Sequence, residues 1–133
     1  MIFAVIDTNV IVAALLTKNH DSPTARVMRA VFAGDVVPLF NGDILNEYRD
    51  VLYRARLQLD REQCDQTISF IIDKGRNIQS ISSKEDFLDP DDRVFYEVAL
   101  AETDAHLVTG NIKHYPNSPI IVTPAQFCEM FGI

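Results

Sequence analysis

Oxygen-bearing side chains recur along this 133-residue chain at places where a divalent cation could be held. Asp7 directly follows Phe3–Ile6, an apolar run typical of a buried parallel strand. Glu47 and Asp92 each lie near the start of a predicted helix, and Asn111 follows a short predicted strand. Carboxylate and amide oxygens, with no His or Cys among them, form a hard site suited to Mg²⁺ or Mn²⁺. Such an ion activates water and stabilises the charge that develops in a phosphodiester displacement.

Each of these acids also has a purely structural explanation. Asp7 can cap the helix predicted after it, assisted by Thr8 and Asn9, because all three residue types favour the N-cap. Glu47 can be an exposed residue near a helix N-terminus, where negative charge is favourable. The acids around residue 90 can serve the same purpose, the first of them as a cap: Asp89, Asp91 and Asp92. A shared site is favoured because parallel strands place their C-terminal ends, and the helices that follow, along one edge.

The apolar pattern predicts strands that alternate with helices. Strands are expected at residues 3–6, 36–40, 78–81, 106–108 and 120–122, with Pro38 marking a strand end or an edge. Helices are expected to begin at the caps Ser22, Asp43, Asp60, Asp89 and Thr123. Phe32 and Ile72 are expected on buried helix faces. The alternation implies a parallel sheet covered on both faces, but two helices between the second and third strands argue against a regular Rossmann repeat.

The composition describes one globular domain spanning residues 1–133, long enough to bury a core. The net charge of −7 argues against a non-enzymatic nucleic-acid binder, whose phosphate-binding surface would be basic. It does not exclude an enzyme whose carboxylates hold cations. No apolar run reaches the roughly 18 to 20 residues that span a bilayer, so no membrane association is expected. Cys64 and Cys128 stand alone and are expected to be reduced and buried, and the protein is expected to be cytoplasmic.

Several enzyme classes lack their sequence motifs here. The chain contains no GxGxxG, no GxxxxGK[ST] and no GxSxG, so a dinucleotide fold, a P-loop ATPase and a serine hydrolase have no support. Aspartyl phosphotransfer is an alternative, because Asp7 ends a strand. A haloacid-dehalogenase-like phosphatase would need an acid where Asn9 stands, and Lys113 is its only candidate lysine.

The ordered set of motifs resembles the PIN-domain family. It is similar in particular to the VapC-like branch, the toxin components of bacterial and archaeal toxin–antitoxin pairs. The resemblance rests on Asp7-Thr8-Asn9, Glu47 on a helix, Asp92 ahead of Phe95 and Ala99, and Leu107–Asn111. It extends from Ile2 to about Val122 and implies a three-layer α/β/α sandwich with a central parallel sheet of about five strands.

The resemblance also implies metal-dependent ribonuclease activity with Mg²⁺ or Mn²⁺ as cofactor. Asp7, Glu47 and Asp92 match the first three acids of the family, the proposed catalytic and metal-binding residues. The matching polar residues that orient carboxylates or water are Thr8, Asn9 and Thr109. Cleavage in this family would leave a 5′-phosphate and a 3′-hydroxyl.

Asn111 departs from the family pattern, because many PIN domains have a fourth Asp there. An amide oxygen can ligate a hard cation or hold a metal-bound water, but it brings no charge. A second metal would therefore bind weakly, which favours catalysis by one metal unless Asp89 or Asp91 compensates. The non-enzymatic alternative is a PIN fold that has lost catalysis and binds protein or RNA. The replacement of the fourth acid by Asn111 would then reflect this loss.

The expected partners are an RNA substrate, a small antitoxin protein bound over the cleft, and a second copy of the chain in a homodimer. Basic residues on the candidate helices and after Asn111 are candidates for contacts with RNA phosphates, although such charges are often simply solvated: Arg49, Arg54, Arg93, Lys113 and His114.

Overall fold

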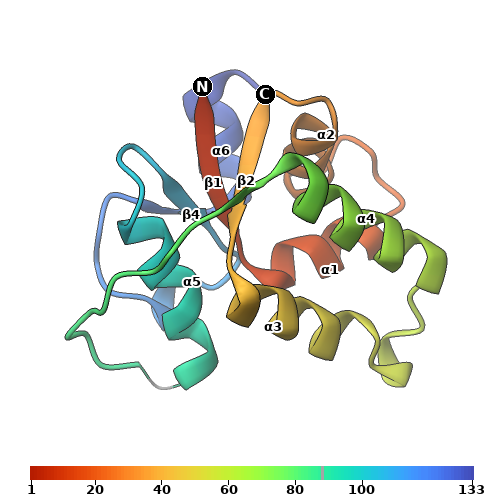
Figure 1. Ribbon diagram of the computed structural model, residues 1–133. Helices are drawn as coiled ribbons and strands as arrows, with labels where there is room; N and C mark the ends of the chain where they lie inside the picture. The colour runs from red at the N-terminus through yellow and green to blue at the C-terminus, as the bar shows by residue number, and fades with distance from the viewer. Residues whose placement is uncertain (88) are drawn as a thin grey trace.

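Five strands form a single parallel sheet at the centre of the protein, in the order β3-β2-β1-β4-β5 (Figure 1). The computed structural model describes residues 1–87 and 89–133. The strands are β1 (Ile2–Ile6), β2 (Val36–Phe40), β3 (Arg76–Asn77), β4 (His106–Val108) and β5 (Ile121–Val122). Since all five are parallel, their C-terminal ends lie at one edge of the sheet.

Helices cover both faces of this sheet. They are α1 (Thr8–Leu16), α2 (Pro23–Phe32), α3 (Gly42–Leu52), α4 (Arg61–Lys74), α5 (Pro90–Leu100) and α6 (Pro124–Phe131), with short 3-10 helices η1 (Ala55–Leu57) and η2 (Ile112–His114). Helix α2 packs against β2 and contacts α1 and α6, whereas α5 packs against β1, β2 and β4 and contacts α3 (Figure 1). The expected three-layer α/β/α architecture is confirmed.

Strand β1 is the centre of the core. Its residues Ala4, Val5 and Ile6 are fully buried, as the continuous apolar run predicts for a strand covered on both faces. On one side β1 pairs with β2, and on the other it pairs with β4 so that Ile6 lies beside Val108. The residues that follow these two, Asp7 and Thr109, therefore leave the sheet next to each other.

Most predicted helix starts are confirmed. The side chains of Ser22, Asp60 and Thr123 accept hydrogen bonds from backbone N–H groups three residues ahead, and Asp89 accepts one from the N–H of Asp91. The predicted cap of α3 is wrong. Asn41, not Asp43, caps this helix by accepting from the N–H of Ile44 at 2.9 Å. Both residue types favour the cap, and Asp43 instead lies in the first turn, where its charge suits the helix dipole.

The predicted strand at residues 78–81 is also wrong. Pairing with β2 occurs earlier, at Arg76–Asn77, and continues only through the N–H of Ile78, which donates to the Phe40 carbonyl. Gly75 explains this entry point, because a Cβ there would lie 2.4 Å from the Pro38 carbonyl oxygen. Strand β3 begins beside Leu39, so Pro38 lies one residue before the pairing of β2 with β3 starts.

Two apolar residues expected in the core lie at the surface. Phe32 is 45% exposed and Ile72 is 44% exposed, although neighbouring residues of α2 and α4 are buried. The Phe32 ring packs edge-on against Phe70 of α4, with ring centroids 5.1 Å apart. Both cysteines are free and buried, as expected. No helix in the described residues is long and apolar enough to cross a membrane.

Candidate active site

The Asp7 carboxylate lies buried at the C-terminal end of β1 and accepts three side-chain hydrogen bonds. All three reach Oδ2: from the Thr109 hydroxyl at 2.8 Å, the Tyr115 hydroxyl at 3.0 Å and the Asn9 amide at 3.3 Å. The side-chain donors therefore fix the orientation of the carboxylate. Among the described residues, none of them donates to Oδ1.

Asp7 occupies the N-cap position of α1, but its side chain makes no capping hydrogen bond. The helix start thus fails to explain this residue, which is turned toward β4 and the loop beyond it. Burial raises the pKa of the Asp7 carboxyl above its ordinary value, and the hydrogen bonds from Thr109 and Tyr115 oppose that rise. A buried carboxylate held in one orientation is a feature of a functional site rather than of a simple cap.

Thr8, Asn9 and Thr109 surround Asp7 in different ways. Asn9 bridges two elements, because its amide donates to Asp7 while its carbonyl accepts the N–H of Gly110 at 3.0 Å. The Thr109 hydroxyl donates to Asp7 and accepts the N–H of Asn111 at 3.0 Å. The buried Thr8 hydroxyl has no hydrogen-bond partner among the described residues, although it lines the same cleft as Asp7.

Glu47 reaches the site from α3, whose position is fixed by its neighbour Tyr48. The Tyr48 hydroxyl donates to the carbonyl oxygen of Ile6 at 2.5 Å, and its ring packs near that of Phe95 on α5. This buried tyrosine therefore ties α3 to the end of β1. The pKa of Glu47 is raised by burial and by the negative charges of Asp91, Asp50 and Asp89.

Asp92 lies in the first turn of α5, three residues before the buried Phe95. Burial and the negative charge of Asp7 are the main causes that raise the pKa of Asp92 to about 6. Asp92 Oδ2 lies 3.5 Å from Nδ1 of His114, which partly opposes this rise. Asp92 and Asp7 therefore interact electrostatically across the edge of the sheet.

One cleft of about 420 Å³ brings these acids together. Asp7, Thr8 and Asn9 line it from the end of β1 and from α1, Glu47 from α3, and Asp92 from α5. Asp89 and Asp91 also line it, in addition to their roles at the helix start. The apolar part of the wall is formed by Val12, Ala13, Leu16, Val51, Leu57 and Phe95, and Arg56 is the cation that lines it.

Asn111 lies at the same edge of the sheet but is exposed and does not line this cleft. Its backbone N–H is tied to Thr109, and the chain then enters η2, which carries the exposed residues Lys113 and His114. Of these two, His114 approaches an acid of the cleft, through its contact with Asp92.

The arginines expected to contact RNA have different surroundings. The Arg93 guanidinium is engaged in hydrogen bonds within the protein. It donates to the Ser83 carbonyl and hydroxyl at 3.0 Å and to the Glu85 carbonyl. Arg54 pairs with Asp50 at 2.8 Å, one turn earlier on the chain. Arg49 is exposed on α3 and does not line the cleft.

Three residues of the site were missed by sequence reasoning. Tyr115 and Tyr48 hold Asp7 and α3 through their hydroxyl groups, and Arg56 lines the cleft. Tyr48 was detectable in part, because it follows Glu47 and carries the apolar periodicity of a helix that packs on the core. No local pattern distinguishes Tyr115 or Arg56, since both are brought to the site by tertiary packing.

The donor set fits a hydrated hard cation better than a closed metal cage. Within residues 1–87 and 89–133, no three His, Cys, Asp or Glu side chains are close enough together to enclose an ion. Mg²⁺ usually keeps several waters and takes only one or two protein carboxylates together with substrate phosphates. Asp7, with Oδ1 free of side-chain donors, and the nearby Asp92 and Glu47 supply such oxygens.

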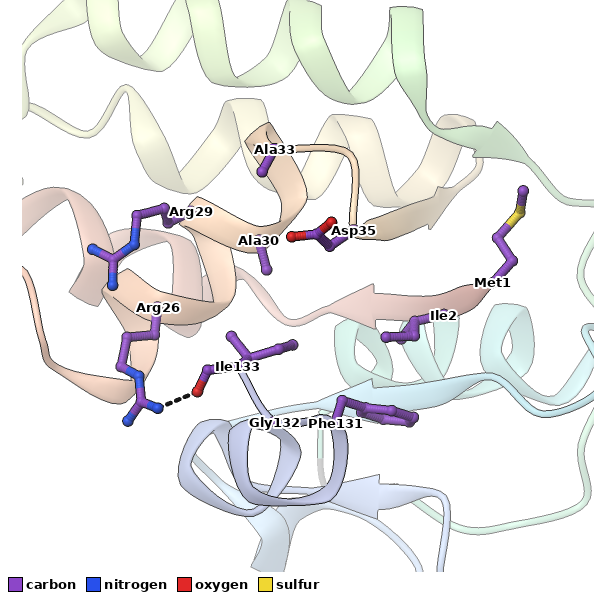
Figure 2. A pocket seen from close by; sticks show the side chains of 10 residues that line it. All are labelled: Met1, Ile2, Arg26, Arg29, Ala30, Ala33, Asp35, Phe131, Gly132 and Ile133. Atoms are coloured by element: carbon purple, nitrogen blue, oxygen red, sulfur yellow. Dashed lines mark hydrogen bonds between the residues drawn. The ribbon is translucent and has the colours of Figure 1, made fainter.

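A larger cavity of about 560 Å³ lies between α2, β1 and the end of α6 (Figure 2). Its only carboxylate side chain is that of Asp35, and Arg26 and Arg29 lie on the wall formed by α2. The Arg26 guanidinium donates to the carbonyl of Ile133, as the dashed line in Figure 2 marks. This cavity offers a cation no cluster of acids, so its size does not make it the catalytic site.

Residues 4–113 match the family model of the PIN domain. Since this match covers most of the chain, the protein belongs to the PIN-domain family, whose members are typically nucleases. No curated protein and no solved structure gave a match in the corresponding comparisons. The family and the acidic cleft together support a nuclease, and they favour it over the phosphotransfer alternative.

Proposed function

We propose that the protein is a Mg²⁺- or Mn²⁺-dependent endoribonuclease and the toxin component of a type II toxin–antitoxin pair, of the VapC-like kind, acting on RNA in the cytoplasm. The observation that carries this proposal is the convergence of Asp7, Glu47 and Asp92 in one cleft, each with a raised pKa. Carboxylates that lie close together with raised pKa values are explained by a cation that they bind in the active enzyme.

Asp7, Glu47 and Asp92 would hold the metal ion, directly or through water, and the Asn111 amide, which does not line the cleft, would contact the ion through a water. When bound, a divalent cation polarises the scissile phosphate and lowers the pKa of a nearby water. Attack by a water on the phosphate, with a cleft carboxylate accepting its proton, would break the bond between phosphorus and the 3′ oxygen and leave a 5′-phosphate and a 3′-hydroxyl.

Asp92 is the proposed general base. A carboxyl with a pKa of about 6 is largely ionised at neutral pH, yet it is basic enough to accept a proton from the attacking water. Asp7 is better suited to holding the cation, because Thr109, Tyr115 and Asn9 keep its carboxylate in one orientation.

We also propose that a small antitoxin protein binds this chain and that the chain forms a homodimer. An apolar groove between α1, α2 and α4, lined in part by Leu15, the half-exposed Phe32 and Phe70, is the candidate contact for the antitoxin. Replacing Phe32 by Asp should then abolish co-purification with an antitoxin without affecting RNA cleavage.

The experiment that tests the nuclease is cleavage of a labelled single-stranded RNA by the purified protein with Mn²⁺, with Mg²⁺ and with EDTA. Asp7→Asn keeps the shape of the side chain but removes its charge, and we expect a loss of at least about 100-fold in rate. Asp35→Asn is the matched control, because Asp35 lies in the cavity at the opposite edge of the sheet.

Two results would count against the proposal. Cleavage that persists in EDTA, or that is equally lost in Asp35→Asn, would rule out the acidic cleft as its source. No cleavage with either metal, together with no Mn²⁺ uptake by calorimetry, would favour a PIN fold that serves only as a binding module.

A further inference from the structure

We propose that Arg56 binds an RNA phosphate next to the scissile one, and so determines where the strand lies in the cleft. This inference rests on the proposed ribonuclease function. Arg56 belongs to η1, the short turn beyond the end of α3 (Figure 1), and lines the cleft that contains Asp7, Glu47 and Asp92.

In the part of the chain that the structure describes, Arg56 has no side-chain partner that explains its position. Among the described residues it makes no ion pair within 4.0 Å and no side-chain hydrogen bond, although five acids line the same cleft. The neighbouring basic residue Arg54, in contrast, pairs with Asp50 at 2.8 Å. An exposed guanidinium in an acidic cleft, unpaired with those acids, is suited to an anionic ligand that enters the cleft.

The wall of the cleft leads from the acids to Arg56. Val51 follows Glu47 by one turn of α3, about 6 Å along the helix axis, and Leu57 follows Arg56 in η1. Leu16, which is 53% exposed, faces the same cleft from α1. A cleft lined by acids, apolar side chains and one cation matches a nucleotide, whose phosphates are charged and whose sugar and base offer apolar surface.

The conformation of η1 gives Arg56 a defined position. Gln58, which ends this turn, adopts the left-handed conformation with φ of 51°, and its N–H donates to the carbonyl of Ala55. Leu57 is partly buried, which anchors the turn on its other side. The backbone at Arg56 is therefore held in one conformation, which limits the part of the cleft that the guanidinium can reach.

The test compares Arg56→Ala with Arg61→Ala, which removes an exposed positive charge five residues away and outside the cleft. With a single-stranded RNA of about ten nucleotides, Arg56→Ala should raise KM about fivefold to tenfold with little change in kcat. The slope of log K against log salt concentration should fall by about 0.7, the value for one lost phosphate contact on a single strand. Arg61→Ala should change KM less than twofold.

A dinucleotide that carries only the scissile phosphate provides the decisive comparison. Wild type and Arg56→Ala should cleave it with equal kcat/KM, because it lacks the neighbouring phosphate. An equal KM for the longer RNA in wild type and Arg56→Ala would overturn the inference while leaving the nuclease intact. An equal loss on the dinucleotide would overturn it too, because Arg56 would then act at the scissile phosphate. If the wild type cleaves neither substrate, the proposed function itself has failed.

Discussion

The Tyr115 hydroxyl donates a hydrogen bond to Oδ2 of Asp7 over 3.0 Å, across a separation of 108 residues in the sequence. Both side chains are buried, with 7% and 6% exposed. Burial and the Asp7 charge raise the pKa of the tyrosine, so its hydroxyl stays protonated at neutral pH and can donate to the carboxylate. The loop after β4 therefore contributes directly to the orientation of the proposed metal ligand.

Tyr115→Phe should weaken metal binding without unfolding the protein. Loss of this donor leaves Asp7 with Thr109 and Asn9, so its carboxylate is less well oriented and its pKa rises further. We expect Mn²⁺ affinity to fall about 10-fold, as is typical when a residue that supports a metal ligand is removed. Titration calorimetry with Mn²⁺ measures this effect.

Tyr53→Phe is the matched control for this experiment. The Tyr53 hydroxyl also donates to a carboxylate, that of Asp65, but it lies outside the cleft. Its replacement should leave Mn²⁺ affinity unchanged. A similar affinity for Tyr115→Phe and wild type would show that Asp7 does not depend on this hydrogen bond for binding a cation.

Metal binding should depend on pH because Asp92 must lose its proton to ligate a cation. Its pKa is raised to about 6, so the carboxylate is mostly ionised at pH 7.5 and mostly neutral at pH 5. Mn²⁺ affinity should therefore fall about 10-fold for each pH unit below about 6 and level off above about pH 7. Calorimetric titrations between about pH 5 and pH 7.5 test this dependence. Asp92→Asn should reduce it to what Asp7 and Glu47 contribute.

The sequence predicted the acidic edge because its determinants are local. The apolar run of β1 must end at Asp7, and the caps Ser22, Asp60 and Thr123 set helix starts through short-range hydrogen bonds. Once strands alternate with helices, a parallel sheet brings the residues after β1 and β4 together. The alternation of strands and helices, and the meeting of Asp7 with the residues after β4, therefore follow from pattern alone.

Other features depend on contacts that a local pattern does not encode. The start of β3 is set by the close approach of Gly75 to the Pro38 carbonyl, 37 residues earlier in the chain. Asn41 and Asp43 are both good caps, and only the packed position of α3 decides between them. Tyr115 reaches Asp7 because the chain turns back at η2 after β4. Long-range packing of this kind determined which side chains complete the site.

Asp92→Asn should stabilise the metal-free protein at neutral pH. The pKa of Asp92 is higher in the folded protein, about 6, than its ordinary value of 3.8. The stability that this shift provides is fully present below about pH 3.8 and is lost as the pH rises through about 6. At pH 7.5 the ionised carboxylate destabilises the folded protein. Asn removes this charge, and we expect the free energy of unfolding to rise by about 1 kcal/mol after allowing for solvent screening.

Urea unfolding in EDTA at pH 7.5 and at about pH 4 measures this gain, which should largely disappear at the lower pH. Asp86→Asn is the control, because Asp86 is exposed and does not line the cleft. A destabilised Asp92→Asn at pH 7.5 would contradict this prediction, because the folded protein would then favour the ionised carboxylate.

Asn111→Asp should strengthen cation binding at the edge of the sheet. The backbone N–H of Asn111 is held by the Thr109 hydroxyl, which also contacts Asp7, so a carboxylate at this position would lie near the acid cluster. The added charge should raise Mn²⁺ affinity by about threefold to tenfold and increase the rate of RNA cleavage at low metal concentration. Asn117→Asp, an exposed change further along the same loop, controls for net charge. An equal gain in both variants would indicate a general electrostatic effect and not a new ligand.

Arg93 should matter for the stability of one loop more than for RNA binding. Its guanidinium holds the carbonyls of Ser83 and Glu85 and stacks 4.9 Å from the centre of the Phe87 ring, which fixes the segment before α5. Arg93→Ala should therefore speed tryptic cleavage after Lys84 at least about 10-fold and lower the unfolding free energy by about 1 kcal/mol. Arg49→Ala, which removes an exposed charge on α3, should change neither the rate of tryptic cleavage nor the free energy of unfolding. RNA affinity should fall no further in Arg93→Ala than in Arg49→Ala. A large loss of RNA affinity with an intact loop would instead assign Arg93 to the RNA surface.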